Sequence, residues 1–288
     1  MKQLVVVSGK GGTGKTTVTA ALAQLLKPAV IADCDVEAPN LHLLLAPHIE
    51  KSFTLNVSSK ARIDPALCDS CGACEEHCRY SAITSSPYLI DPFLCEGCKV
   101  CELVCPQKAV SFYEPGGAEV FIASTEYGPM VGAELAVGEE ASGKVVTRVR
   151  MEAQLMSAES DISLVMVDGS PGTGCPVIAS LSGANLALVV TEPTVAGRHD
   201  LGRILQVIEH FGVPAIACIN KWDINPGIAE EIKDSCVAAG VEIAAEIPFR
   251  EEVVEVLRSG RPPIGKVPDE VQAPIRRLAA RIETLLDV

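Results

Sequence analysis

Short apolar runs, each bounded by glycine, proline or acidic residues, recur along the chain and are typical of buried strands. They predict strands at residues 4–7, 29–32, 162–167, 187–190, 215–219 and 243–247, and a short strand at 53–57. Apolar positions at helical spacing follow the first run and return near the C-terminus, at Ile275, Leu278, Ala279, Ile282, Leu285 and Leu286. Strands that alternate with helices predict an α/β fold.

The stretch 120–150 has a different pattern, with alternating segments that are broken by glycines. Its apolar segments, VFIA at 120–123 and VVTRV at 145–149, predict a β-rich return to the main sheet. Ser142, Gly143 and Lys144 predict a turn with a solvated lysine, and the alternative is a contact with a partner or a cluster.

A glycine-rich loop follows the first predicted strand and reads GKGGTGKT at residues 9–16. This is the G-x-x-x-x-G-K-T phosphate-binding pattern, in which backbone amides and a helix N-terminus surround phosphate oxygens. Lys15 is expected to reach the β- and γ-phosphates, and Thr16 to ligate Mg²⁺. The residues predicted to bind the nucleotide here are Gly9, Lys10, Gly11, Gly12, Thr13, Gly14, Lys15, Thr16 and Thr17.

The same loop also satisfies the dinucleotide-binding pattern G-x-G-x-x-G, with Gly9, Gly11 and Gly14 as its glycines. Asp33 follows at the end of the next strand, as that pattern requires. The dinucleotide interpretation leaves Lys15 and Thr16 unexplained, whereas the triphosphate interpretation requires both. The sequence therefore favours a nucleoside triphosphate.

Acidic residues follow two of the predicted strands. Asp33 and Asp35 come after the strand at 29–32, and Asp168 comes after the strand at 162–167. The carboxyl ends of parallel strands meet at one edge of an open α/β sheet, where the phosphates bind. Asp168 is expected to bind or orient Mg²⁺ through water, and Asp35 to contact Mg²⁺-bound or attacking water. In the alternative, Asp33 and Asp35 only cap the next turn.

Eight of the twelve cysteines lie between residues 68 and 105, in two runs of C-x2-C-x2-C-x3-C. This is the spacing of bacterial two-cluster ferredoxins, in which the fourth cysteine of each run ligates the other cluster. It predicts two [4Fe–4S] clusters within an insert at 59–112, between nucleotide-binding segments at 1–58 and 113–288. Zinc is the alternative, although zinc sites usually use separated C-x2-C pairs. The predicted ligand sets are Cys68, Cys71, Cys74 and Cys105, and Cys95, Cys98, Cys101 and Cys78.

With Lys10, the loop reads K-G-G-T-G-K-T and resembles the deviant Walker A motif of the MinD/ParA/Mrp ATPases. Asp168 to Gly172 resembles the switch II segment of that family. The resemblance implies a doubly wound, mainly parallel sheet and a homodimer, or a related heterodimer. In that dimer Lys10 would reach the partner's ATP; the alternative is a solvated lysine. Cys175 lies at the spacing of a cluster cysteine in the related nitrogenase iron protein, and is either an interface thiol or an inert one.

The strand at 215–219 ends in Asn220, Lys221, Trp222 and Asp223, which fit the N-K-x-D motif of GTPases. In the MinD-like family an asparagine at this position contacts adenine. The resemblance therefore implies that Asn220 and Lys221 lie near the base, and Pro248 is expected to border it. ATP is favoured over GTP, although the carboxylate of Asp223 would suit guanine.

The formal net charge of −13 argues against non-specific binding of nucleic acid. No apolar segment approaches the roughly 18 residues of a membrane span, and no secretory cleavage pattern follows the first apolar run. A cytoplasmic protein is therefore expected, and ligated thiolates are favoured over disulfides. Cys34, Cys218 and Cys236 lie in apolar contexts and are expected to be core thiols.

The most direct interpretation is an ATPase whose nucleotide-driven dimer switch gates electron transfer through two [4Fe–4S] clusters to a protein partner. Lys10, Lys15, Asp35 and Asp168 would be its catalytic residues. One alternative is an ATP-dependent protein that assembles or delivers iron–sulfur or metal clusters. Another is a plain electron carrier in which the nucleotide is only structural.

Overall fold

The computed structural model describes residues 1–137, 139 and 143–288, and its chain divides into two compact units. The larger unit comprises Met1–Phe53, Val120–Glu134 and Ala141–Val288. The smaller unit comprises Thr54–Glu119 and Leu135–Glu140, and contains the eight clustered cysteines.

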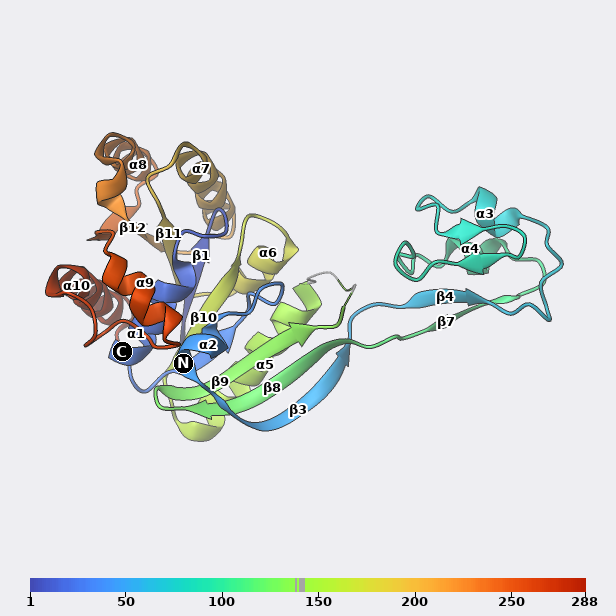
Figure 1. Ribbon diagram of the computed structural model, residues 1–288, viewed down its shortest axis with the longest axis horizontal. Coiled ribbons are helices and arrows are strands. Elements are labelled where there is room, and N and C mark those ends of the chain that lie inside the picture. The colour runs from blue at the N-terminus through green and yellow to red at the C-terminus, as the bar shows by residue number, and fades with distance from the viewer. Residues whose placement is uncertain (138, 140–142) are drawn as a thin grey trace. The chain divides into compact units, whose positions relative to one another are not determined.

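A nine-stranded sheet is the main element of the fold (Figure 1). The strand order is β13 (Glu242–Ile247), β12 (Ala215–Asn220), β11 (Leu186–Thr191), β1 (Lys2–Ser8), β10 (Leu164–Pro171), β2 (Val30–Asp33), β9 (Gly128–Leu135), β8 (Gly117–Thr125) and β3 (His48–Asn56). Neighbouring strands from β13 to β9 pair in parallel, which confirms the α/β class and the mainly parallel sheet. β1 lies between β10 and β11, so the loop after β1 opens at the same edge as the ends of its neighbours.

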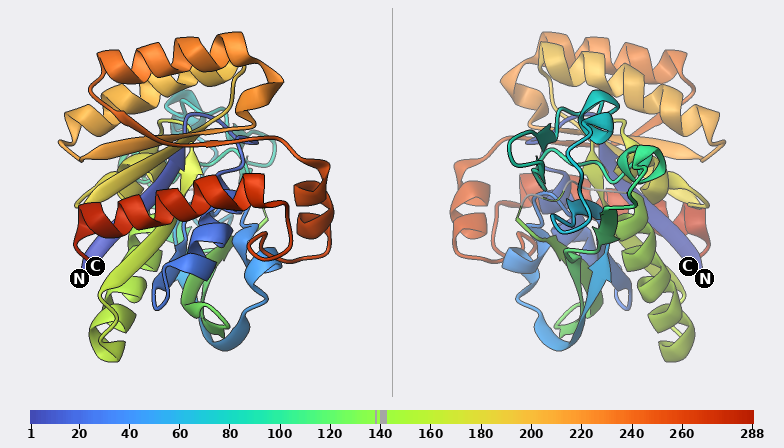
Figure 2. Two further views of the ribbon diagram at one scale, coloured as in Figure 1. Left: turned by 90° about the vertical axis from the view of Figure 1, so that its left-hand side faces the viewer. Right: turned by 90° about the vertical axis from the view of Figure 1, so that its right-hand side faces the viewer.

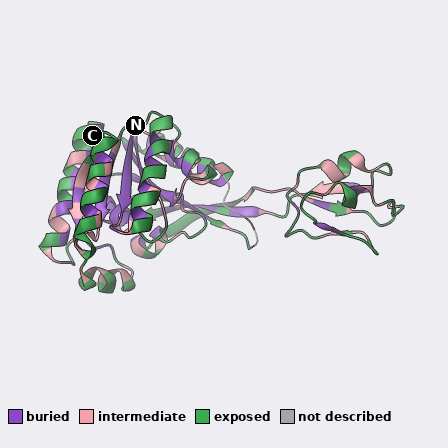
Figure 3. Ribbon diagram, turned by 90° about the horizontal axis from the view of Figure 1, so that it is seen from above, coloured by how far each residue is buried: buried purple, intermediate pink, exposed green. Residues whose placement is uncertain are grey.

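Helices cover both faces of the sheet, and the central strands are buried (Figures 2 and 3). On one face α1 (Lys15–Leu25) packs against α10 (Asp269–Leu286), and on the other α5 (Gly143–Ser160) packs against α6 (Cys175–Leu181). Leu4 and Val6 alternate toward the first face and join one core cluster with Leu22, Leu278 and Ile282. The remaining helices are α2 (Leu41–Leu45), α7 (Val195–His210), α8 (Pro226–Ala238), α9 (Glu251–Arg258) and the 3₁₀ turn η1 (Trp222–Ile224).

The C-terminal helix α10 packs on the sheet, as its apolar face predicts, although Leu285 remains 40% exposed. Within the described part of the chain, none of the helices is long and apolar enough to cross a membrane.

The β-rich return predicted for 120–150 is only half correct. β8 and β9 contain its first half, but residues 145–149 belong to helix α5, and the predicted turn at Gly143 and Lys144 is the start of that helix. Ser142 lies outside the described residues. The helical period continues to residue 160 and outweighs the strand preference of three valines and a threonine. The buried residues that follow this period are Val145, Val146, Val149, Arg150, Ala153 and Ser157.

The smaller unit consists of short elements around its cysteines. β4 (Lys60–Ile63) pairs antiparallel with β7 (Val110–Tyr113), and β5 (Ile83–Thr84) with β6 (Leu89–Ile90). The cysteine runs contain the one-turn helices α3 (Ala73–Glu76) and α4 (Val100–Val104).

Candidate functional site

The glycine-rich loop joins β1 to α1 at the carboxyl edge of the sheet. Gly14 precedes the helix with φ +90°, and a Cβ there would lie 2.1 Å from Asn220 Nδ2. At Gly9 a Cβ would lie 2.5 Å from the carbonyl oxygen of Asp200. The buried hydroxyl of Thr13 has no hydrogen-bond partner among the described residues. An unpaired buried donor is costly, so this hydroxyl fits a loop that surrounds an anion.

A cavity of about 640 Å³ opens beside this loop in the larger unit. Its walls include both the phosphate-binding loop and the loops after β12 and β13. Gly9, Lys10 and Asp168, which were also predicted as site residues, do not line it. The predicted residues that do are Gly11, Gly12, Thr13, Gly14, Lys15, Thr16, Thr17, Asp35, Asn220, Lys221 and Pro248.

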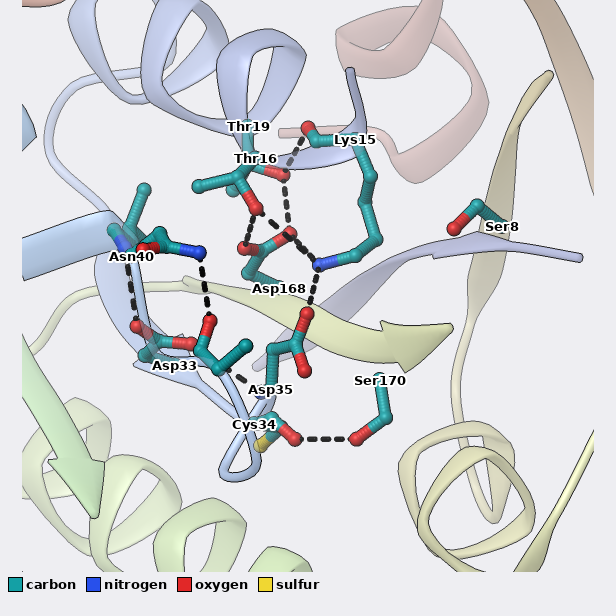
Figure 4. Close-up of polar contacts among 12 residues, drawn as sticks. Ser8, Lys15, Thr16, Thr19, Asp33, Cys34, Asp35, Asn40, Asp168 and Ser170 are labelled. Carbon is teal, nitrogen blue, oxygen red and sulfur yellow. Dashed lines mark hydrogen bonds and ion pairs between the residues drawn. The ribbon is translucent and has the colours of Figure 1, made fainter. Parts of the chain in front are cut away.

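Asp168 does not line the cavity and is completely buried. Its carboxylate accepts hydrogen bonds from Lys15 Nζ at 2.8 Å, Thr16 Oγ1 at 2.8 Å and Thr19 Oγ1 at 2.9 Å (Figure 4). Burial alone would lower the pKa of Lys15, but the carboxylates of Asp168 and Asp35 raise it. Lys15 is therefore a permanent cation, and Thr16 and Asp168 bring together the oxygens that Mg²⁺ prefers.

Asp33 and Asp35 follow β2 and take different positions. Asp35 Oδ2 lies 3.4 Å from Lys15 Nζ and lines the cavity. Asp33 is buried and accepts hydrogen bonds from the backbone nitrogens of Asp35 and Leu41, as a capping residue does. The capping alternative therefore fits Asp33, whereas Asp35 faces the predicted site.

We expect Asp33→Asn to make stability less dependent on pH. Burial and the nearby Asp168 raise the pKa of Asp33 from 3.8 to about 8. Between these values the folded protein holds a proton that the unfolded chain has released, so rising pH favours unfolding. The slope reaches about 1.4 kcal/mol per pH unit for one proton. Urea unfolding at pH values from 5 to 8 would measure this slope. If the free energy of unfolding changed with pH equally in the parent protein and in Asp33→Asn, the raised pKa of Asp33 would be contradicted.

Glu192, just after β11, is a site residue that the sequence did not predict. Its carboxylate accepts hydrogen bonds from Lys10 Nζ at 2.6 Å and Lys221 Nζ at 2.9 Å. Burial would raise the pKa of Glu192, but the two lysines hold it below its ordinary value. The only signal in the sequence was a glutamate shortly after the strand predicted at 187–190.

The N-K-x-D residues Asn220, Lys221 and Asp223 form hydrogen bonds that hold neighbouring loops in place. Asn220 Nδ2 donates to the carbonyl oxygen of Thr13 at 2.8 Å, and Lys221 Nζ donates to that of Gly12 at 3.1 Å. Asp223 accepts from the backbone nitrogen of Phe249 at 2.7 Å and from Arg250 Nη1 at 2.8 Å. Both oxygens of Asp223 therefore anchor the segment after β13, and Asp223 itself does not line the cavity.

Asp223→Asn is expected to leave base preference unchanged. A guanine-reading carboxylate accepts from the base, and its amide counterpart would favour xanthine instead. Because Asp223 anchors Phe249 and Arg250, the variant should weaken ATP, GTP and XTP alike, by about two- to fivefold. Competition binding with the three nucleotides measures this. A selective gain for XTP would mean that Asp223 reads the base.

The eight clustered cysteines line two small hollows in the smaller unit. Cys68, Cys71, Cys74 and Cys105 line one, together with Tyr88. Cys78, Cys95, Cys98 and Cys101 line the other, together with Phe112. The hollows thus divide the cysteines in the crossed pattern of the two predicted ligand sets. Within the described residues, no three His, Cys, Asp or Glu side chains are grouped tightly enough to count as a formed metal site.

One backbone nitrogen donates to a cysteine sulfur in each hollow. The backbone nitrogen of Ala61 donates to Cys95 Sγ at 3.4 Å, and that of Ala109 donates to Cys105 Sγ at 3.3 Å. Lys60 Nζ donates to the carbonyl oxygen of Cys95 at 2.9 Å. Burial, followed by the charge of Cys95, raises the pKa of Cys101 to about 11. Thiols with this pKa become thiolates when a metal replaces the proton, and the donors suit the resulting negative sulfur.

The other four cysteines lie in the larger unit. Cys34, Cys218 and Cys236 are completely buried, as predicted for core thiols. Cys175 is exposed and begins α6, directly after the segment that follows Asp168. Its predicted place at a dimer interface stays a prediction.

Comparison with known proteins identifies the family. Residues 4–264 match the sequence model of the CobQ/CobB/MinD/ParA nucleotide binding domain. An uncharacterized protein of Methanocaldococcus jannaschii is 36% identical over 230 residues, which cover 77% of this chain and 79% of that protein.

Solved structures agree with the fold. A chain of the MinC:MinD cell division protein complex of Aquifex aeolicus matches with a TM-score of 0.58 and 21% identity, over 99% of this chain and 96% of that one. MinD of Pyrococcus horikoshii, complexed with Mg-ADP, matches with a TM-score of 0.58 and 18% identity, over the same shares. The chain therefore belongs to the CobQ/CobB/MinD/ParA family of P-loop ATPases.

Proposed function

We propose that this chain is an ATPase that gates electron transfer through two [4Fe–4S] clusters to a protein partner. Its nucleotide-binding domain would span residues 1–58 and 113–288, and its ferredoxin-like module residues 59–112. The observation that carries the proposal is the division of eight cysteines between two hollows in the crossed ferredoxin pattern, on the same chain as the phosphate-binding loop.

ATP would bind in the 640 Å³ cavity, with its phosphates on the loop of residues 9–17. Lys15 would contact the β- and γ-phosphates, while Thr16 and Asp168 would hold Mg²⁺ directly or through water. Asp35 would orient the attacking water, and Asn220, Lys221 and Pro248 would lie beside the base. Supporting this, the polar groups of Lys15, Thr16 and Asp168 already lie within hydrogen-bonding distance. Catalysis of this kind depends on charge positioning.

A second copy of the chain, or a closely related one, would complete the site. Lys10 does not line the cavity of its own subunit, and its side chain is 27% exposed. It would contact the nucleotide of a partner after leaving Glu192, to which its Nζ donates in this structure. Hydrolysis would then alter the association of the two subunits through the glycine-containing segment after Asp168, which includes Gly169, Gly172 and Gly174.

When bound, [4Fe–4S] clusters supply one-electron carriers within the protein. Cys68, Cys71, Cys74 and Cys105 would hold one cluster, and Cys95, Cys98, Cys101 and Cys78 the other. The backbone donors of Ala61 and Ala109 would stabilise the negative sulfurs. The residues present thus fit the proposed clusters in their number and in their division between two hollows, each with one backbone donor to a sulfur.

Anaerobic purification followed by EPR of the reduced protein, with and without ATP, tests this function. We expect about eight irons per chain and spectra or reduction behaviour that change with ATP. Iron well below that content would refute the clusters. Identical spectra and reduction behaviour in both states would refute the coupling.

A cluster carrier is the second candidate, and one observation favours it. Each set contains one exposed cysteine, Cys71 or Cys98. There an acceptor thiol would replace the cysteine as a ligand of the iron, and the displaced cysteine would take up the proton that the acceptor thiol loses. A carrier should transfer iron and sulfide to an apo-ferredoxin, and faster with ATP. Full retention of iron after incubation with that acceptor would favour electron transfer.

A further inference from the structure

We propose that Glu192 is a positioning residue for ATP hydrolysis. Its carboxylate holds Lys10 within its own subunit and must release it before Lys10 can contact a nucleotide in a second copy of the chain. This inference rests on the proposed role of Lys10 and adds the residue that controls it.

The position of Glu192 follows from the strand order. β11 pairs in parallel with β1 over Leu4–Val7, so the residue after β11 lies beside the loop that leaves β1. Glu192 Oε1 contacts Lys10 Nζ at 2.6 Å, and Oε2 contacts Lys221 Nζ at 2.9 Å. Only 14% of the Glu192 side chain is exposed, so these charge-assisted bonds are partly shielded from water.

Glu192 also connects three loops of the site. Lys221 donates to the carbonyl oxygen of Gly12 as well as to Glu192, and Asn220 donates to that of Thr13. The phosphate-binding loop, the end of β11 and the end of β12 are thereby joined. Within this network the Glu192 carboxylate accepts hydrogen bonds from both Lys10 and Lys221.

Release of Lys10 therefore exchanges one anion for another. A lysine bound to Glu192 lies outside its own cavity and must leave that carboxylate to reach the phosphates of a partner. The pair with Glu192 reduces the fraction of subunits whose Lys10 is ready to do so. A smaller competent fraction weakens the apparent affinity in proportion, so the pair should raise the ATP concentration needed for association.

Glu192→Gln in the full chain tests this role. The variant removes the charge and keeps the shape, and it should lower the ATP concentration for half-maximal dimerisation by about three- to tenfold. The KM for ATP should fall by a similar factor, while kcat at saturating ATP should change by less than about twofold. Analytical ultracentrifugation against ATP concentration and steady-state hydrolysis give the two readouts.

The same substitution in a Lys10→Ala background is the decisive control. If Glu192 acts through Lys10, Glu192→Gln should then have no further effect. Glu209→Gln, an exposed glutamate on α7, is the matched charge control and should behave as the parent protein. Lys10 and Lys221 remain 27% and 29% exposed and can hydrate, so Glu192→Gln is expected to fold. If Glu192→Gln does not fold, Glu192→Asp, which keeps the charge, replaces it. This variant should also lower the ATP concentration needed for dimerisation, but by a smaller factor.

Three results would overturn the inference: an unchanged ATP requirement, a weaker ATP response, or an equal change with and without Lys10. The last would mean that Glu192 acts through Lys221 and the loop. Failure of the proposed function looks different, because Lys10→Ala alone would then dimerise with ATP as well as the parent chain does.

Discussion

The double variant Cys68→Ser, Cys105→Ser is expected to retain about four of the roughly eight irons per chain. Both cysteines line the same hollow, so only one of the two proposed clusters is lost. The double variant Cys95→Ser, Cys105→Ser is expected to retain almost no iron, because these cysteines line different hollows and each proposed cluster loses a ligand. Iron and sulfide analysis after anaerobic purification gives the content. EPR of the reduced protein should retain one cluster signal in the first variant and lose both in the second.

The two double variants separate a crossed from a sequential arrangement. If each run of four cysteines held its own cluster, the outcomes would be reversed, since Cys95 and Cys105 belong to one run and Cys68 to the other. Serine at Cys68 and Cys71 is the matched control, because these two share a set in both arrangements and should leave about four irons. If this control variant contained no iron at all, the module would need both clusters in order to fold.

Lys15→Ala is expected to weaken ATP binding by on the order of 100-fold or more while the iron content stays unchanged. The substitution removes a buried cation whose nitrogen lies 2.8 Å from Asp168 and 3.4 Å from Asp35. Two carboxylates then lose the cation that balances them beside the triphosphate. The eight clustered cysteines belong to the other unit, so the iron of the proposed clusters should not respond.

Titration calorimetry with ATP and iron analysis on one preparation measure both effects. Lys233→Ala is the matched control, because this lysine forms surface ion pairs with Glu230 and Glu246 away from the loop. It should keep both ATP and iron. Loss of iron in Lys15→Ala would mean that the two units are not independent, and retained ATP affinity would remove the loop from the binding site.

The sheet was predictable from sequence because its strands are buried on both faces. Leu4 to Val7 are completely buried, so both faces are apolar and the strand appears as an unbroken run. Residues 145–149 look similar over so short a window, yet they form a helix. Only the longer spacing to Ala153 and Ser157 separates the two outcomes.

Some residues of the candidate site could also be predicted from sequence, whereas others could not. Lys15 and Asp168 are 153 residues apart in sequence, and only their motifs predicted that they would meet. Glu192 carries no motif, because a glutamate after a strand is common, and its meaning depends on the pairing of β11 with β1. The N-K-x-D motif was visible, but the partners of Asp223 come from the loop after β13 and could not be inferred from spacing.

The deep burial of Cys34, Cys218 and Cys236 has a practical consequence for work in air. Burial raises the pKa of each of these thiols, and their sulfurs are shielded from solvent. Oxygen and alkylating reagents should therefore damage the smaller unit and Cys175 first. An aerobic sample that still binds ATP normally would then have lost the proposed clusters already, and nucleotide affinity would be a poor measure of its quality.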